Sequence, residues 1–118
     1  MSFPTIPGIN SEAGLDLYGG EMDIYIGAME SYAANTPRVI DSLKNVNMDN
    51  LKDYAVNVHG LKSVSLTIGA EDLGEKAKKL EFLAKSGDLA GVLADNEELL
   101  KDANVLVEDI KKWLESQK

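Results

Sequence analysis

The sequence predicts an all-α protein, an antiparallel up-down-up-down four-helix bundle with a short extra helix at the N-terminal side. Five segments place apolar residues at the three-and-four spacing of a helix face, and none alternates as a strand would. The connections are short, and short connections favour antiparallel neighbours. At 118 residues the chain suits one domain. Residues 1–8, which hold two of the three prolines, are expected to form an extended arm, and residues 9–118 the single bundle domain.

The first helix is expected to be short. Asn10 or Ser11 can cap it through a side-chain oxygen, and it runs to about Leu17. Gly19-Gly20 then ends it, because glycine accepts the backbone conformation that follows a helix. The residues alone do not decide whether this segment packs on the other helices or is a mobile tail.

A second helix is expected from Glu21 to Asn35, and one dipeptide decides how it continues. Thr36-Pro37 is a capping side chain followed by proline at a first helical position. It marks either a kink in one long helix or a true break. In both cases the apolar face continues to about Asn45. The face predicted to be core consists of Met22, Tyr25, Ile26, Met29, and Tyr32 or Ala33.

The third helix contains His59, the only histidine of the chain. Residues 45–48 form the preceding turn, and Asp49 is the expected cap. Gly60 costs about 1 kcal/mol relative to alanine inside a helix; it either permits close approach of another backbone or is simply a tolerated small residue. Gly69 ends the helix or allows tight packing. The predicted apolar face consists of Leu51, Tyr54, Ala55, Val58, Leu61 and Ser65.

The last two helices are separated by a clear stop signal. Glu71 or Asp72 starts the fourth helix, and residues 86–88 (Ser-Gly-Asp) end it and cap the fifth. The fifth helix, residues 89–115, carries a sustained apolar seam in the heptad style. Asn96 interrupts this seam, which indicates either a buried polar contact or a local exit from the core.

The composition argues against several kinds of function. A net charge of −8 disfavours nucleic acid, whose phosphates need basic patches. The absence of cysteine excludes disulfides, thiol catalysis and thiolate metal sites, and one imidazole supplies too few ligands for a histidine metal site. No apolar run approaches the roughly 20 residues that span a bilayer, and the first residues lack the pattern of a secretion signal. We therefore expect no metal, no membrane segment and a cytoplasmic location.

His59 is expected at the edge of the apolar face of its helix, next to the side that faces solvent. An imidazole ring titrates near neutral pH, and its neutral form can attack an electrophilic centre. Lys62 and Ser63 follow one helical turn later; a lysine suits phosphoryl charge, and a small residue leaves clearance beside the ring. No strained turn of a Ser-His-Asp triad is indicated. Gly19-Gly20 lacks the Gly-Lys-Ser/Thr ending of a nucleotide loop, so autophosphorylation is not expected.

Three motifs follow one another along the middle of the chain, at residues 59–63 (His-Gly-Leu-Lys-Ser), 69–73 (Gly-Ala-Glu-Asp-Leu) and 80–81 (Leu-Glu). This pattern resembles the histidine-containing phosphotransfer (HPt) domain family, with its His-x-Leu-Lys-Gly, Gly-Ala-x-x-Leu and Leu-Glu elements. Together with an entry segment similar to residues 14–25, the resemblance covers residues 9 to 115. It departs from the family at Ser63, where glycine is usual.

The resemblance implies a phosphoryl carrier of a two-component phosphorelay, not an enzyme with kinase activity of its own. His59 would accept a phosphoryl group at Nε2 from a receiver-domain aspartate and pass it to another aspartate. Lys62 would offset phosphoryl charge, and Ser63 would provide clearance. Val56 and Leu66, which flank the histidine on the same side, are the expected partner contacts.

The implied partners are response-regulator receiver domains and a hybrid sensor kinase, with the chain itself a monomer. No cofactor is expected on this chain, since Mg²⁺ belongs to the receiver domain. The family also implies that the short first helix closes one end of the bundle.

The alternative interpretation is a helical adaptor or dimerisation bundle in which His59 has no chemical role. Exposure of the imidazole distinguishes the two. A buried ring with both nitrogens bonded inside the protein favours the adaptor, whereas a projecting ring beside Lys62 favours the carrier.

Overall fold

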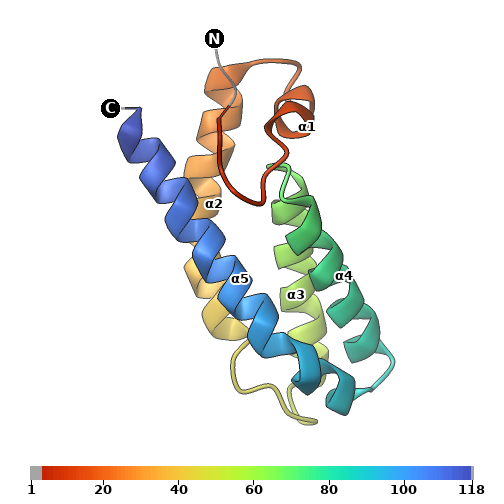
Figure 1. Cartoon of the computed structure of the whole chain (residues 1–118). Coiled ribbons are helices and arrows are strands. Elements are labelled where there is room, and N and C mark those ends of the chain that lie inside the picture. The colour runs from red at the N-terminus through yellow and green to blue at the C-terminus, as the bar shows by residue number, and fades with distance from the viewer. Residues whose placement is uncertain (1–3, 118) are drawn as a thin grey trace.

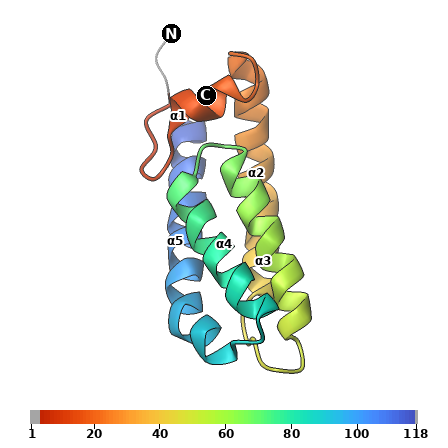
Figure 2. The same cartoon turned by 90° about the vertical axis from the view of Figure 1, so that its right-hand side faces the viewer.

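The computed structural model describes residues 4–117, and within that range the chain is entirely helical, with no strand. The five helices are α1 (Ser11–Asp16), α2 (Met22–Ser42), α3 (Leu51–Leu66), α4 (Glu71–Lys85) and α5 (Leu89–Ser116). The four longer helices lie alongside one another, and α1 lies at one end of them (Figure 1, Figure 2). The predicted all-α class is confirmed. Between residues 4 and 117, no helix combines the length and apolar content that crossing a bilayer requires.

The short helix α1 is fastened to the loop between α3 and α4. The side chain of Asn10 accepts a hydrogen bond from the backbone of Ala13, which confirms the predicted cap. The backbone nitrogen of Asn10 donates to the carbonyl of Gly69 at 2.8 Å. From α2, the Tyr25 hydroxyl donates to the carbonyl of Ile68 at 2.8 Å. The N-terminal segment therefore packs on the other helices and is not a mobile tail.

The described part of the N-terminal arm also lies against the helices. Ile6 is buried in the core, and the chain turns at residues 7–8, where Gly8 has a φ of 84°. The hydroxyl of Ser11 donates to the carbonyl of Pro4. Residues 1–3 of the predicted arm lie outside the described residues.

Helix α2 runs without a break through Thr36-Pro37, so one long helix is the correct alternative. Thr36, which sequence reasoning treated as a capping residue, is buried in the middle of the helix at 1% exposure. The helix ends at Ser42, three residues before the predicted end. Asn45 follows with a φ of 59°, a left-handed conformation that asparagine tolerates better than most residues.

The expected cap at Asp49 is wrong. The N-cap of α3 is Asn50, and no side chain caps the helix there. The turn is held instead by reciprocal asparagine contacts. The side-chain oxygen of Asn47 accepts from the backbone nitrogens of Asp49 and Asn50, and the side-chain oxygen of Asn50 accepts from the backbone nitrogen of Asn47. Asparagine side chains commonly replace backbone partners in turns, and here they leave Asp49 without a capping role.

One core joins the helices, and it contains a polar centre. All six residues predicted for the inner face of α3 are buried. Within this core, Asn96 of α5 donates to the carbonyl of Leu43 at 2.9 Å and accepts from the hydroxyl of Tyr54 at 2.7 Å. Burial without a charged partner raises the pKa of Tyr54. Asn96 is therefore the buried polar contact, and the seam of α5 does not leave the core there.

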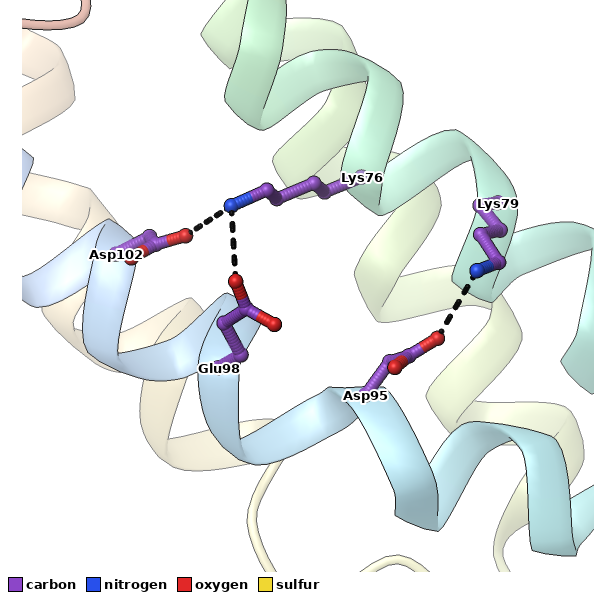
Figure 3. Close-up of polar contacts among 5 residues, drawn as sticks. All are labelled: Lys76, Lys79, Asp95, Glu98 and Asp102. Carbon is purple, nitrogen blue, oxygen red and sulfur yellow. Dashed lines mark hydrogen bonds and ion pairs between the residues drawn. The ribbon is translucent and has the colours of Figure 1, made fainter.

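Ion pairs on the surface join α4 to α5 (Figure 3). Lys76 pairs with both Glu98 and Asp102, and Lys79 pairs with Asp95 at 3.2 Å. The hydrogen bond from Lys76 to Asp102 raises the pKa of the lysine. All five side chains are well exposed, so each pair is expected to contribute little to stability. Two of the lysines of α4 are thus directed to α5, away from α3.

Candidate functional site

His59 lies on the exposed side of α3. Its chain neighbour Val58 is completely buried, as is Leu61 on the inner face. Successive residues of a helix differ by about 100° in direction, so the histidine is turned out of the core. Its side chain is 54% exposed. The imidazole therefore projects from the packed helices rather than filling space between them.

The ring is held by a buried carboxylate on the next helix. Nδ1 of His59 lies 2.9 Å from Oε2 of Glu81 in α4, whose side chain is only 7% exposed. Burial alone would raise the pKa of Glu81, but hydrogen bonds from Lys85, Lys62 and His59 outweigh it and lower the pKa to about 2. Glu81 is therefore ionised at neutral pH and can only accept hydrogen bonds. It follows that Nδ1 carries the proton of this contact.

The other ring nitrogen is left available. In a neutral imidazole with a proton on Nδ1, Nε2 holds the lone pair. Among residues 4–117, no hydrogen bond or ion pair of His59 reaches Nε2. A carboxylate that holds one ring nitrogen fixes both the tautomer and the orientation of the ring, as it does for metal-bound histidines. The arrangement presents a nucleophilic nitrogen to solvent.

Two lysines share the same carboxylate. Nζ of Lys62 lies 3.0 Å from Oε1 of Glu81, and Nζ of Lys85 lies 2.6 Å from Oε2. Lys62 therefore reaches the histidine through Glu81 and not by direct contact. With two ammonium groups and one carboxylate, the cluster formed by His59, Lys62, Glu81 and Lys85 is net positive in a chain of net charge −8, whether or not the ring is protonated. Such a cluster can hold an anion beside Nε2.

Sequence reasoning missed Glu81 and Lys85 as members of the site. In the sequence, Glu81 belongs to the Leu-Glu motif. The lysines of the fourth helix, Lys85 among them, were interpreted as a solvated face paired with Glu75 and Glu81 in preference to a basic patch for phosphate. A usable signal was present for the pair, since Glu81 and Lys85 are four residues apart and so adjoin on one helix face. That this face of α4 lies against the histidine was not predictable from spacing alone.

The remaining predicted site residues lie on the exposed half of α3. Ser63 is exposed, and within residues 4–117 its hydroxyl has no hydrogen-bond partner. Val56 is 70% exposed and Leu66 is 39% exposed. Two exposed apolar side chains were not predicted: Val64 on α3, and Phe82, which follows Glu81 on α4. The surroundings of the imidazole therefore include apolar surface that a partner protein can cover.

A shallow groove of about 310 Å³ runs between α2 and α3 beside the site. Gly60 and Val64 line it from α3, and Ser31 and Asn35 are among its α2 residues, none of which is charged. A Cβ atom at Gly60 would meet nothing within 4 Å. No close approach inside this chain therefore explains the glycine, and the space beside it is open to a partner.

Comparison of the chain with known proteins identified no relative that would assign a role to this site. Among residues 4–117, no three histidine, cysteine or acidic side chains are grouped as metal ligands. No family model, no curated protein and no solved structure matches the chain.

Proposed function

We propose that this chain is a phosphoryl carrier of the HPt family in a two-component phosphorelay. His59 accepts a phosphoryl group from an aspartate of one receiver domain and passes it to an aspartate of another. The observation that carries the proposal is the exposed imidazole, whose Nδ1 donates to the ionised Glu81 and whose Nε2 has no bonding partner among the described residues 4–117. The four long helices and their short connections support the finer fold proposal, an antiparallel up-down-up-down bundle with α1 as its short extra helix.

The chemistry is a direct displacement at phosphorus. The lone pair of Nε2 attacks the phosphorus of the aspartyl phosphate in line, a P–N bond forms, and the P–O bond breaks to release the aspartate carboxylate. The ring gains positive charge in this step, and Glu81 stabilises it through the proton on Nδ1. Lys62 offsets phosphoryl charge, and Ser63 leaves clearance for the group. Transfer to the next aspartate is the reverse displacement.

The proposed partners are response-regulator receiver domains and a hybrid sensor kinase. Val56 and Leu66 are the proposed contacts on α3, and the exposed Phe82 extends the apolar surface onto α4. The Mg²⁺ ion of the reaction belongs to the receiver, and the chain acts as a cytoplasmic monomer without kinase activity of its own. A carrier of this kind needs no nucleotide site.

The test is incubation with phosphorylated receiver domains from the same genome, using the unmodified chain and a His59→Gln variant of equal helix content. The expected result is acid-labile label on the chain that is lost entirely in the variant, because no other imidazole is present. Absence of label with every receiver, or label that survives the substitution, would overturn the proposal. Full signalling by the variant in cells would favour the adaptor alternative.

A further inference from the structure

The two lysines that hold Glu81 differ in their freedom to move. Lys62 is only 21% exposed and binds Oε1, whereas Lys85, at the end of α4, is 65% exposed and binds Oε2. Oε2 already accepts the proton of His59 Nδ1. If Lys85 moves away, each oxygen of Glu81 therefore keeps one partner, Lys62 on Oε1 and His59 on Oε2. Of the two lysine partners of Glu81, Lys85 has the more exposed side chain, so its ammonium can turn toward another anion with less rearrangement of the protein.

We propose that Lys85 is a phosphoryl-binding residue: when His59 carries a phosphoryl group on Nε2, the ammonium of Lys85 moves from Glu81 to the phosphoryl oxygens. This inference rests on the proposed function. A single carboxylate oxygen bridges Nζ of Lys85 and Nδ1 of His59, so the ammonium starts beside the ring. Its flexible four-carbon stem allows the ammonium to turn toward a group on the other ring nitrogen.

The charge balance supplies the driving force. In the reactive form, two ammonium groups face one carboxylate and a neutral ring. The phosphoryl group carries a charge of about −1.5 to −2 at neutral pH. The positive charge that the ring gains offsets part of it, so the cluster falls from net positive to about neutral, and a second anion then lies near Glu81. Pairing Lys85 with the phosphoryl group relieves this repulsion, while Lys62 and Nδ1 continue to satisfy the buried carboxylate.

Two other cations of α4 are engaged elsewhere. Lys76 and Lys79 pair with acidic residues of α5 (Figure 3). Lys79 is 68% exposed, nearly the same as Lys85, and also makes an ion pair. A Lys79→Met substitution therefore removes the same charge from the same helix, and it is a matched control for the net charge of the chain.

The experiment compares Lys85→Met, Lys85→Arg and Lys79→Met in the full chain with one phosphorylated receiver domain. Two quantities are measured: the equilibrium ratio of label on His59 to label on the receiver, and the ³¹P chemical shift of the phosphohistidine. Hydrogen bonds to charged groups contribute about 1.5–3 kcal/mol, so Lys85→Met should lower the ratio roughly tenfold or more and shift the ³¹P signal. Lys85→Arg should restore most of the ratio, and Lys79→Met should stay within about twofold of the unmodified chain.

Two results would overturn the inference alone: a Lys85→Met variant that matches the unmodified chain in both quantities, or equal losses in Lys85→Met and Lys79→Met. Both leave His59 labelled and the proposed function intact. If the unmodified chain takes no label, the proposed function itself fails and this inference fails with it. Thermal unfolding of each variant is measured alongside, and the label ratio is compared at a temperature at which all of them are folded, which separates loss of phosphoryl binding from loss of folding.

Discussion

Nδ1 of His59 and Oε2 of Glu81 lie 2.9 Å apart, although the residues are 22 positions apart in the chain and belong to different helices. This contact decides which ring nitrogen can react. Because an ionised carboxylate accepts only, the proton stays on Nδ1 and the lone pair is directed away from the protein. The account of the site depends on this contact more than on any other.

Glu81→Gln should slow labelling of His59 by about 10- to 100-fold, by analogy with the loss of a carboxylate that orients a metal-ligating histidine. The amide keeps the shape of the side chain but removes the charge, so it neither enforces the Nδ1 proton nor stabilises the charged ring. The initial rate of labelling from a phosphorylated receiver measures the effect. Glu75→Gln, an exposed position on the same helix, is the control. Equal rates in the two variants would show that Glu81 has no part in the reaction.

The same carboxylate should make stability depend on pH. Its pKa is lowered from 4.5 to about 2 in the folded chain, so its ionised contacts contribute stability above pH 4.5. That contribution should decline as the pH falls below 4.5 and disappear near pH 2. Urea unfolding of the unmodified chain and of Glu81→Gln should therefore differ at pH 7 and converge toward pH 2. A difference in unfolding free energy that is the same at both pH values would contradict the assignment.

Gly69→Ala should lower the free energy of unfolding by about 2–3 kcal/mol, because two constraints meet at this residue. Its φ is 86°, and an added Cβ would lie 2.3 Å from the backbone oxygen of Asn10. Gly27→Ala is the control, since that helical position in α2 has open space around it. The free energy of unfolding of this control should rise by up to about 1 kcal/mol. Chemical denaturation measures both, and a neutral Gly69→Ala would mean that α1 is not fastened to this loop.

Asn96→Leu should destabilise the chain by about 2–4 kcal/mol, because it leaves two buried groups without partners. These are the carbonyl of Leu43 and the hydroxyl of Tyr54. Asn104→Leu makes the same substitution at an exposed position of the same helix, and it should leave the free energy of unfolding nearly unchanged. The midpoints of urea unfolding compare the two variants. If Asn96→Leu lowers the free energy of unfolding by less than about 1 kcal/mol, the hydrogen bonds of Asn96 do not stabilise the core as described.

Helical periodicity predicted most of the fold, because the apolar residues of the long helices recur at helical spacing and several helix ends carry a recognisable signal. Asn10, Gly69 and Asp88 occur at helix ends as expected. The wrong cap arose where one local preference replaced another, since the asparagine turn before α3 made a cap at Asp49 unnecessary. The sequence left a kink or a break open at residues 36–37, and Pro37 is accommodated inside α2.

The candidate site was predictable only in part. The exposed position of His59 followed from its angle relative to the apolar face, and so did the exposure of Val56 and Ser63. The contact of His59 with Glu81 did not follow, and neither did the place of Lys85 in the site, because both depend on how α4 is aligned against α3. That alignment is set by packing between helices, and no spacing within either helix reports it.

The most direct test of the account uses the fact that the chain has a single imidazole. After incubation of ¹⁵N-labelled protein with a phosphorylated receiver, long-range ¹H–¹⁵N correlation and ³¹P–¹⁵N coupling identify the nitrogen that carries phosphorus. The account predicts phosphorus on Nε2 and a proton on Nδ1. Phosphorus on Nδ1, or a ring that stays unmodified with every receiver domain, would contradict it.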